Sequence, residues 1–115
     1  MKTSLIITTL NEQNTVADFI KSAVEQTVLP TELIIIDGGS ADTTLEKIIS
    51  SAQKYKKLSI IYSIKKGNRS VGRNEGVKLS HYDILLFSDA GCILDKNWVE
   101  EITRPLTDKT IDVIA

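Results

Sequence analysis

Residues 33–40, Leu-Ile-Ile-Ile-Asp-Gly-Gly-Ser, decide the fold of this 115-residue chain. Four consecutive branched apolar residues are typical of a strand that is covered on both faces, as in a parallel sheet. An aspartate and two glycines follow directly, so the strand ends in a polar turn. Residues 84–89, Ile-Leu-Leu-Phe-Ser-Asp, repeat this order of apolar strand and polar end. The two segments predict two central strands of a parallel sheet.

Outward from these strands, short β-branched runs alternate with segments of helical periodicity. The predicted strands are residues 5–9, 33–37, 58–63, 84–88 and 111–114. The predicted helices are residues 16–24, 45–52, 70–80 and 97–104. Such alternation is typical of parallel strands that are joined by crossover helices. We therefore expect an α/β fold with an open, mainly parallel sheet and helices on both faces, of the Rossmann-like kind.

The four helix signals differ in strength. In the first two helices, apolar residues recur at i, i+3, i+4 and i+7, which is one stripe of an α-helix. Capping pairs are predicted at their starts, namely Thr15 with Asp18 and Thr43 with Glu46. The third helix has no clean apolar stripe, and the last is expected to end at Pro105.

Length and composition fit one folded domain over residues 1–115, with 42% hydrophobic and 25% charged residues. The single cysteine, Cys92, excludes an internal disulfide framework and indicates a reducing, cytoplasmic compartment. The N-terminus shows no signal-peptide pattern. No apolar run approaches the roughly 20 residues that a bilayer-spanning helix requires.

Charge is distributed unevenly, although the formal net charge is only -1. Residues 43–81 carry nine basic and two acidic groups, whereas residues 1–42 carry two basic and six acidic groups. Solvated helix and loop faces are the simplest explanation of the basic segment. A phosphate-bearing ligand and an anionic membrane surface are the functional alternatives. No nucleic-acid partner is expected, because aromatic residues, which would stack on bases, make up only 5% of the chain.

Polar and glycine residues follow the predicted strands, and ligands bind at the carboxyl ends of strands in open parallel sheets. The segments are residues 8–12 (Thr-Thr-Leu-Asn-Glu), 37–42 (Asp-Gly-Gly-Ser-Ala-Asp), 65–76 and 89–92 (Asp-Ala-Gly-Cys). Asp37 and Asp89 each end an apolar strand, where a carboxylate is costly to desolvate unless a partner donates to it. We expect a binding site between them. Gly38 and Gly39 are equally well explained by a tight turn, and Asp42 by a helix cap.

The ordered set of segments resembles family 2 glycosyltransferases of the A-type fold over essentially the whole chain. The resemblance is carried by residues 9–12 (Thr-Leu-Asn-Glu), 32–44 (Glu-Leu-Ile-Ile-Ile-Asp-Gly-Gly-Ser-Ala-Asp-Thr-Thr), 72–76 (Gly-Arg-Asn-Glu-Gly) and 84–92 (Ile-Leu-Leu-Phe-Ser-Asp-Ala-Gly-Cys). It implies the donor half of an inverting enzyme that binds a nucleoside diphosphate sugar, preferably a UDP-sugar. Thr9, Glu12 and Asp37 would then bracket the base, with Asp37 accepting from its ring N–H. Arg73 would lie near the nucleotide, and Asp89 would open the D-x-D motif beside the ribose and the metal-bound pyrophosphate.

Two positions depart from the pattern of the resembled family. Gly38 replaces a second acidic residue before the Gly-Ser turn, and Gly91 stands where the D-x-D motif usually supplies a metal ligand. Divalent Mn²⁺ or Mg²⁺ prefers several oxygen ligands, so Asp89 alone predicts a weak metal site that forms with the donor. Asp95 could add a carboxylate, although capping of the following helix explains it better. Cys92 is expected to be a packed small residue rather than a thiolate ligand.

No catalytic residue is predicted within the chain. In the resembled family, the general base that deprotonates the acceptor hydroxyl comes from the second half of the domain. Asp37 and Asp89 are committed to the donor, whereas a base must reach the proton of the acceptor. The full enzyme is expected to act on a saccharide or lipid-linked acceptor by direct displacement. The chain alone, which we read as ending before the acceptor half, is expected to bind donor without transfer.

Other function classes remain open at this point. Another α/β nucleotide-binding protein, such as a nucleotidyltransferase, shares the fold class, although the G-x-x-x-x-G-K-[ST] and G-x-G-x-x-G motifs are absent. A phosphoacceptor signalling domain would require two acidic residues where Thr8 and Thr9 stand. A non-catalytic nucleotide-binding or assembly module is the third alternative. We also expect peripheral association with the inner face of a membrane, and a homo-oligomer that covers an exposed sheet edge.

Overall fold

A computed structural model describes residues 1–108 and 113–114, with side chains described for residues 1–106. Five strands form one sheet in the order β3-β2-β1-β4-β5, and every neighbouring pair is parallel. The strands are β1 (Thr3–Thr9), β2 (Glu32–Asp37), β3 (Ser59–Ile64), β4 (Ile84–Phe87) and β5 (Val113–Ile114). The helices are α1 (Val16–Val24), α2 (Thr44–Lys54), α3 (Arg69–Leu79) and α4 (Trp98–Thr103), followed by the 3-10 helix η1 (Arg104–Asp108). The predicted open parallel sheet is confirmed.

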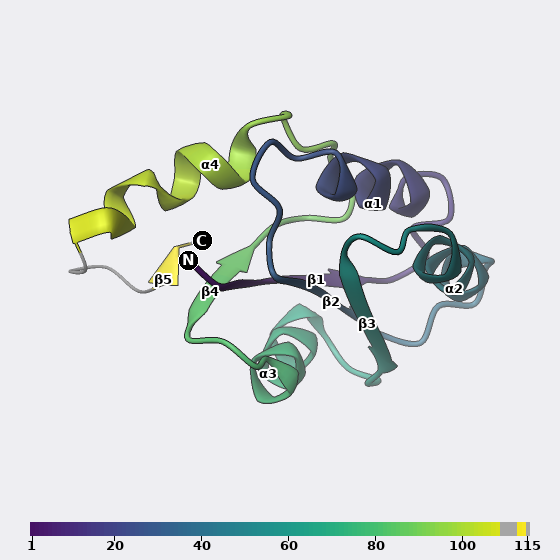
Figure 1. The fold of residues 1–115 in the computed structure, drawn as a ribbon. Coiled ribbons are helices and arrows are strands. Elements are labelled where there is room, and N and C mark those ends of the chain that lie inside the picture. Colours follow the sequence, from purple (N-terminus) through teal and green to yellow (C-terminus); the bar gives the residue numbers. More distant parts are fainter. Residues whose placement is uncertain (109–112, 115) are drawn as a thin grey trace.

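Helices cover both faces of the sheet, with α1 and α4 on one face and α3 on the other (Figure 1). The larger core lies on the face of α1 and α2, where Phe19 and Ile48 join Ile7 and Ile35 in one cluster. Every residue of β2 is buried, because this strand lies between β1 and β3 and is covered on both faces. The run of isoleucines in β2 is therefore explained by its central position.

Helix α3 packs on the opposite face through glycines rather than through an apolar stripe. Gly72 and Gly76, one turn apart, are its buried residues. A Cβ atom on Gly72 would lie 2.7 Å from Cγ2 of Thr8, and one on Gly76 would lie 2.5 Å from Cγ2 of Ile6. Real Cβ atoms do not approach so closely, so the helix reaches the sheet only because both positions lack a side chain. This packing explains why the segment is helical without periodic apolar residues.

The two predicted capping pairs are not formed. Helix α1 begins after Thr15, whose hydroxyl donates to Glu12 instead of accepting from the first helical turn. At the start of α2, Thr43 makes no side-chain cap bond, and Oδ1 of Asp42 accepts from the N–H of Thr44 at 2.9 Å. The helix-cap explanation of Asp42 is therefore confirmed, whereas the cap predicted for Thr43 is wrong. Hydrogen bonds from Thr44 hold the pKa of Asp42 below its ordinary value.

The C-terminal part agrees with prediction as far as the structure describes it. Helix α4 ends at Thr103, before Pro105, and Val99 is buried against the core. Val113 and Ile114 pair with β4, and the remaining residues of the predicted 111–114 strand lie outside the described residues. No helix in the described part of the chain combines the length and the apolar content that crossing a bilayer requires.

Candidate functional site

A hollow of about 230 Å³ lies at the carboxyl ends of β1, β2 and β4, next to the start of α3. These strands are adjacent and parallel, so their ends and the following loops meet at one edge of the sheet (Figure 1). The lining residues are Thr8, Thr9, Leu10, Glu12, Ile36, Gly38, Gly67, Asn68, Arg69, Gly72 and Asp89. Three predicted site residues, Thr9, Glu12 and Asp89, therefore share one hollow.

Asp37 does not line this hollow, but it accepts a hydrogen bond from Thr9, which does. It is 2% exposed, and its Oδ1 accepts from the hydroxyls of Thr9 at 2.7 Å and Ser40 at 2.6 Å. Its Oδ2 accepts from the N–H groups of Gly39 at 3.1 Å and Ser40 at 2.8 Å. Burial by itself would raise the pKa of Asp37, but these bonds outweigh it and hold the pKa below its ordinary value. The ionised carboxylate thus joins the turn after β2 to the end of β1.

The loop after β1 contributes Leu10 and Glu12 to the wall of the hollow. Glu12 is half-buried, and its Oε2 accepts from the hydroxyl of Thr15 at 3.1 Å. Leu10 is 53% exposed, which leaves much of its apolar surface open to a ligand. The wall therefore offers a carboxylate acceptor beside an apolar contact surface.

Asp89 lies in the loop two residues after the end of β4, with an exposed side chain. Its Oδ1 accepts from the N–H of Gly91 at 2.9 Å. Gly91 adds no ligand atom, and Sγ of Cys92 donates to the backbone carbonyl of Asp89 at 3.0 Å. Among the residues with described side chains, no group of three or more His, Cys, Asp and Glu could hold a metal ion. A single carboxylate requires further oxygen ligands, such as those of a bound phosphate, to hold Mn²⁺ or Mg²⁺.

Arg69, rather than the predicted Arg73, is the basic residue that lines the hollow. The guanidinium carbon of Arg73 lies 5.7 Å from the centroid of the Phe87 ring. Asn68 also lines the hollow and caps α3, since its Oδ1 accepts from the N–H of Val71 at 3.0 Å. Asn68 and Arg69 belong to the loop after the third predicted strand, but neither was predicted as a site residue. An asparagine directly before a helix was the available signal.

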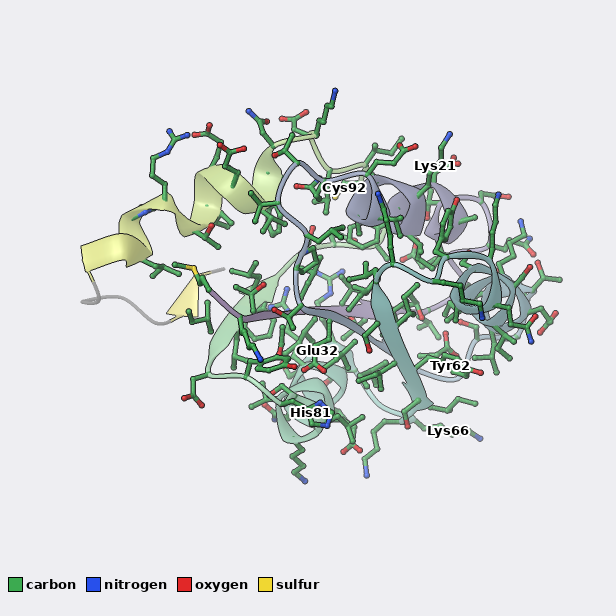
Figure 2. All side chains as sticks on the ribbon, viewed as in Figure 1. Lys21, Glu32, Tyr62, Lys66, His81 and Cys92 are labelled. Carbon is green, nitrogen blue, oxygen red and sulfur yellow. The ribbon has the colours of Figure 1, made fainter. Side chains whose placement is uncertain are left out.

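A buried carboxylate, Glu32, lies at the opposite edge of the sheet, at the start of β2. It is 3% exposed and accepts from the hydroxyl of Ser4 at 2.7 Å and from the N–H of His81 at 2.8 Å. Nδ1 of His81 lies 2.8 Å from Oε1 of Glu32, and Figure 2 labels both side chains. Burial by itself would raise the pKa of Glu32, but these bonds outweigh it and hold the pKa below its ordinary value. The contact joins the start of β2 to the segment after α3, far from the hollow.

Comparison with known proteins identifies the family. The family described as "Glycosyl transferase family 2" matches residues 4–115. The chain belongs to this family. The family 2 chain is 33% identical over 117 residues to poly(ribitol-phosphate) beta-N-acetylglucosaminyltransferase TarP of Staphylococcus aureus, covering 98% of this chain and 35% of that protein. It is 29% identical to the cholesterol galactosyltransferase of Borreliella burgdorferi, over 99% of this chain and 32% of that protein.

Solved structures show the same A-type glycosyltransferase fold. The mannosyltransferase PcManGT from Pyrobaculum calidifontis, in complex with GDP-Man and Mn²⁺, matches with a TM-score of 0.87 at 19% identity, over 96% of this chain and 33% of that one. Staphylococcus aureus TarS 1-349, in complex with UDP-GlcNAc, matches with a TM-score of 0.78 at 24% identity. The match covers 94% of this chain and 32% of that one. The family 2 chain thus spans about a third of the length of these relatives. The other function classes considered from the sequence gain no support from these matches.

Proposed function

We propose that the hollow binds the nucleoside diphosphate of a sugar donor, and that the full-length enzyme transfers the sugar with inversion of configuration. One observation carries the proposal: Thr9, Glu12 and Asp89 come from separate segments and line one hollow at the carboxyl edge of the family's sheet. A UDP-sugar is the preferred donor, and the UDP-GlcNAc complex among the similar structures supports it. The acceptor is proposed to be a saccharide or a lipid-linked saccharide.

Thr9, Glu12 and Asp37 are proposed to bracket the base. Glu12 offers a carboxylate oxygen to the N–H groups of a base, and Leu10 offers an apolar surface to its ring. Asp37 already accepts four hydrogen bonds, two of them from hydroxyls that can rotate. A ring N–H would therefore reach Asp37 by replacing the hydroxyl of Thr9 or Ser40, while the two backbone donors stay in place.

Asp89 is proposed to contact the ribose and to hold Mn²⁺ or Mg²⁺ together with phosphate oxygens of the donor. When bound, such a metal neutralises charge on the diphosphate leaving group. Arg73 is proposed to lie near the nucleotide, and its guanidinium lies beside the ring of Phe87, two residues before Asp89. No residue of this chain is proposed as the general base, so the chain alone is expected to bind donor without transferring sugar.

We further propose a cytoplasmic protein that is peripheral at the inner face of the membrane and forms a homo-oligomer. The single cysteine supports a reducing compartment, and the basic segment supports an anionic surface. Strand β3 lies at an edge of the sheet with Ile64 53% exposed, and open edges promote association. Light scattering tests the oligomer, and a monomer at every concentration would contradict it.

Calorimetry with UDP, GDP, CDP and dTDP, each with and without Mn²⁺, tests the donor site. We expect UDP to bind weakly and more tightly with Mn²⁺. Glu12→Gln is expected to weaken UDP binding by about tenfold or more, the scale of a hydrogen bond to a charged group. The matched control is Glu25→Gln, which is exposed at the end of α1 and does not line the hollow. Binding that is unchanged in Glu12→Gln would contradict the site.

Mass spectrometry of products, with a panel of UDP-sugars and saccharide acceptors, tests the catalytic part of the proposal. Orientation of two reactants contributes up to roughly 7 to 11 kcal/mol of barrier lowering, and a general base about 10² to 10⁴-fold in rate. We expect the 115-residue chain to lack both and to form no glycoside. Robust transfer by this chain would show that a general base lies within it.

A further inference from the structure

The loops after β1 and β2 both contribute to the hollow, yet polar bonds rather than apolar packing hold them together. Leu10 and Asn11 in the first loop and Gly39 and Ala41 in the second are exposed. Without an apolar core between the loops, their relative position depends on hydrogen bonds. Those bonds are made by residues 11–13, and neither Asn11 nor Gln13 was predicted to have a role.

Asn11 is the one non-glycine residue with a positive φ among the described residues, at 54°. Asparagine tolerates this left-handed conformation better than most residues. Its N–H donates to Oγ of Ser40 at 2.8 Å, and its Oδ1 accepts from the N–H of Ala41 at 2.9 Å. The same Ser40 hydroxyl donates to Asp37. Asn11 is therefore bonded twice to the turn that Asp37 organises.

Gln13, which follows Glu12, also accepts hydrogen bonds through its side-chain oxygen from the segment after β2. Its Oε1 accepts from the N–H of Thr43 at 3.2 Å and from the Thr43 hydroxyl at 2.8 Å. The N–H of Glu12 itself donates to Oγ1 of Thr44 at 2.8 Å. Residues 11–13 of the first loop are thus bonded to the second loop and to the first residue of α2.

We infer that Asn11 is a positioning residue, which together with Gln13 holds Leu10 and Glu12 in the wall of the donor hollow. Neither Asn11 nor Gln13 lines the hollow, so they act through the residues beside them. The positive φ at Asn11 turns the chain between Leu10 and Glu12, so that both of these alternate residues reach the same hollow. The inference rests on the proposed function, because the bonds between the loops position a nucleotide site only if the hollow binds a nucleotide.

Two substitutions of Asn11 separate its side-chain bond from its backbone conformation. Asn11→Gly keeps the positive φ without strain but loses the Oδ1 acceptor for Ala41. Asn11→Asp keeps an acceptor oxygen at the same place. Calorimetry with UDP and Mn²⁺ measures affinity, and amide hydrogen exchange of Ala41 measures the loop bond directly. Gln53→Ala, exposed on α2, is the matched control.

We expect Asn11→Gly to weaken UDP binding by about fivefold, the equivalent of one hydrogen bond, with its thermal midpoint close to that of the unmodified chain. Asn11→Asp and the control are expected to retain the original affinity. Exchange at Ala41 is expected to accelerate in Asn11→Gly only, while the Thr44 amide, which donates to Asp42, stays protected in all variants.

Undiminished UDP affinity in Asn11→Gly would overturn the inference, as would equal losses in Asn11→Gly and Asn11→Asp. If the unmodified chain binds none of the four nucleotides, the proposed function fails instead. In that case the exchange measurement still tests the hydrogen bond between Asn11 and Ala41. An exchange rate of Ala41 that is unchanged in Asn11→Gly would show that this bond does not hold the two loops together.

Discussion

At the scale of single residues, Asp37 shows how a buried charge is kept ionised. It is 2% exposed, and two hydroxyls and two backbone N–H groups donate to it. A carboxylate that gains such bonds on folding has a folded pKa below its unfolded value. Its contribution to stability is therefore present above the unfolded pKa and is lost as the pH falls through the folded pKa.

Asp37→Asn is expected to lower the free energy of unfolding at pH 7 by about 1.5 to 3 kcal/mol, because bonds to a charged acceptor are replaced by bonds to an amide. Urea denaturation at pH 7 and at pH 3 measures the effect. The unmodified chain is expected to lose stability as the pH falls below about 4, and the variant to lose less over that range. Asp18→Asn, on the exposed face of α1, is the control. Parallel pH profiles for Asp37→Asn and the unmodified chain would contradict this account.

At the scale of elements, α3 depends on two glycines for its place on the sheet. The helix carries Asn68 at its cap and Arg69 in its first turn, so its depth against β1 sets where these residues meet the hollow. Glycine is normally unfavourable inside a helix, by about 1 kcal/mol relative to alanine. Its presence at Gly72 and Gly76 is explained by the close approach to Thr8 and Ile6. Tertiary packing here overrides local helix propensity.

Gly76→Ala is expected to destabilise the fold by about 1 to 3 kcal/mol, because the new methyl group would lie 2.5 Å from Cγ2 of Ile6 in a packed interior. This strain is expected to exceed the gain in helix propensity. Asn74→Ala, exposed on the same helix, gains propensity without a clash and is expected to be neutral or stabilising. Thermal and urea unfolding compare the two variants. A Gly76→Ala variant as stable as Asn74→Ala would show that the helix shifts freely.

At the scale of the whole molecule, charge is segregated along the sheet. Residues 47–74 carry eight basic groups and no acidic group, and they include most of α2, the edge strand β3 and the start of α3. Figure 2 shows Lys66 and Tyr62 on the side of β3, away from Lys21 on α1. Tyr62 is 41% exposed and Ile64 is 53% exposed on that strand. Cationic groups beside exposed apolar groups suit an anionic lipid surface.

Sedimentation with phosphatidylcholine vesicles, with and without phosphatidylglycerol, measures this association. Binding is expected only with the anionic lipid, and to fall steeply in 0.5 M salt, where charges are screened. Lys56→Gln is expected to weaken binding by about 1 kcal/mol, the contribution of one lysine near such a surface. Lys21→Gln, on α1 and outside the basic segment 47–74, is expected to leave binding unchanged. Equal binding to neutral and anionic vesicles would contradict an electrostatic association.

The sequence by itself determined the elements and their order. Apolar runs and helical periodicity are local properties, so the strands and the helices appeared at nearly the predicted bounds. The polar ends of β1 and β4 also followed, because parallel strands must end at one edge of the sheet. Thr9, Glu12 and Asp89 line the hollow at this edge, and their role in donor binding stays a prediction.

Only the tertiary structure decided which groups are hydrogen-bonded to one another and which pack together. The bonds from Thr9 to Asp37 and from Ala41 to Asn11 join residues 28 and 30 positions apart. They depend on the register of β1 with β2, in which Thr9 lies opposite Asp37. A one-residue shift in register would turn the side chains to the other face, and the continuous apolar run of β2 has no alternation that would specify the register. The approach of Gly76 to Ile6 is likewise a contact between elements, which periodicity within one helix could not reveal.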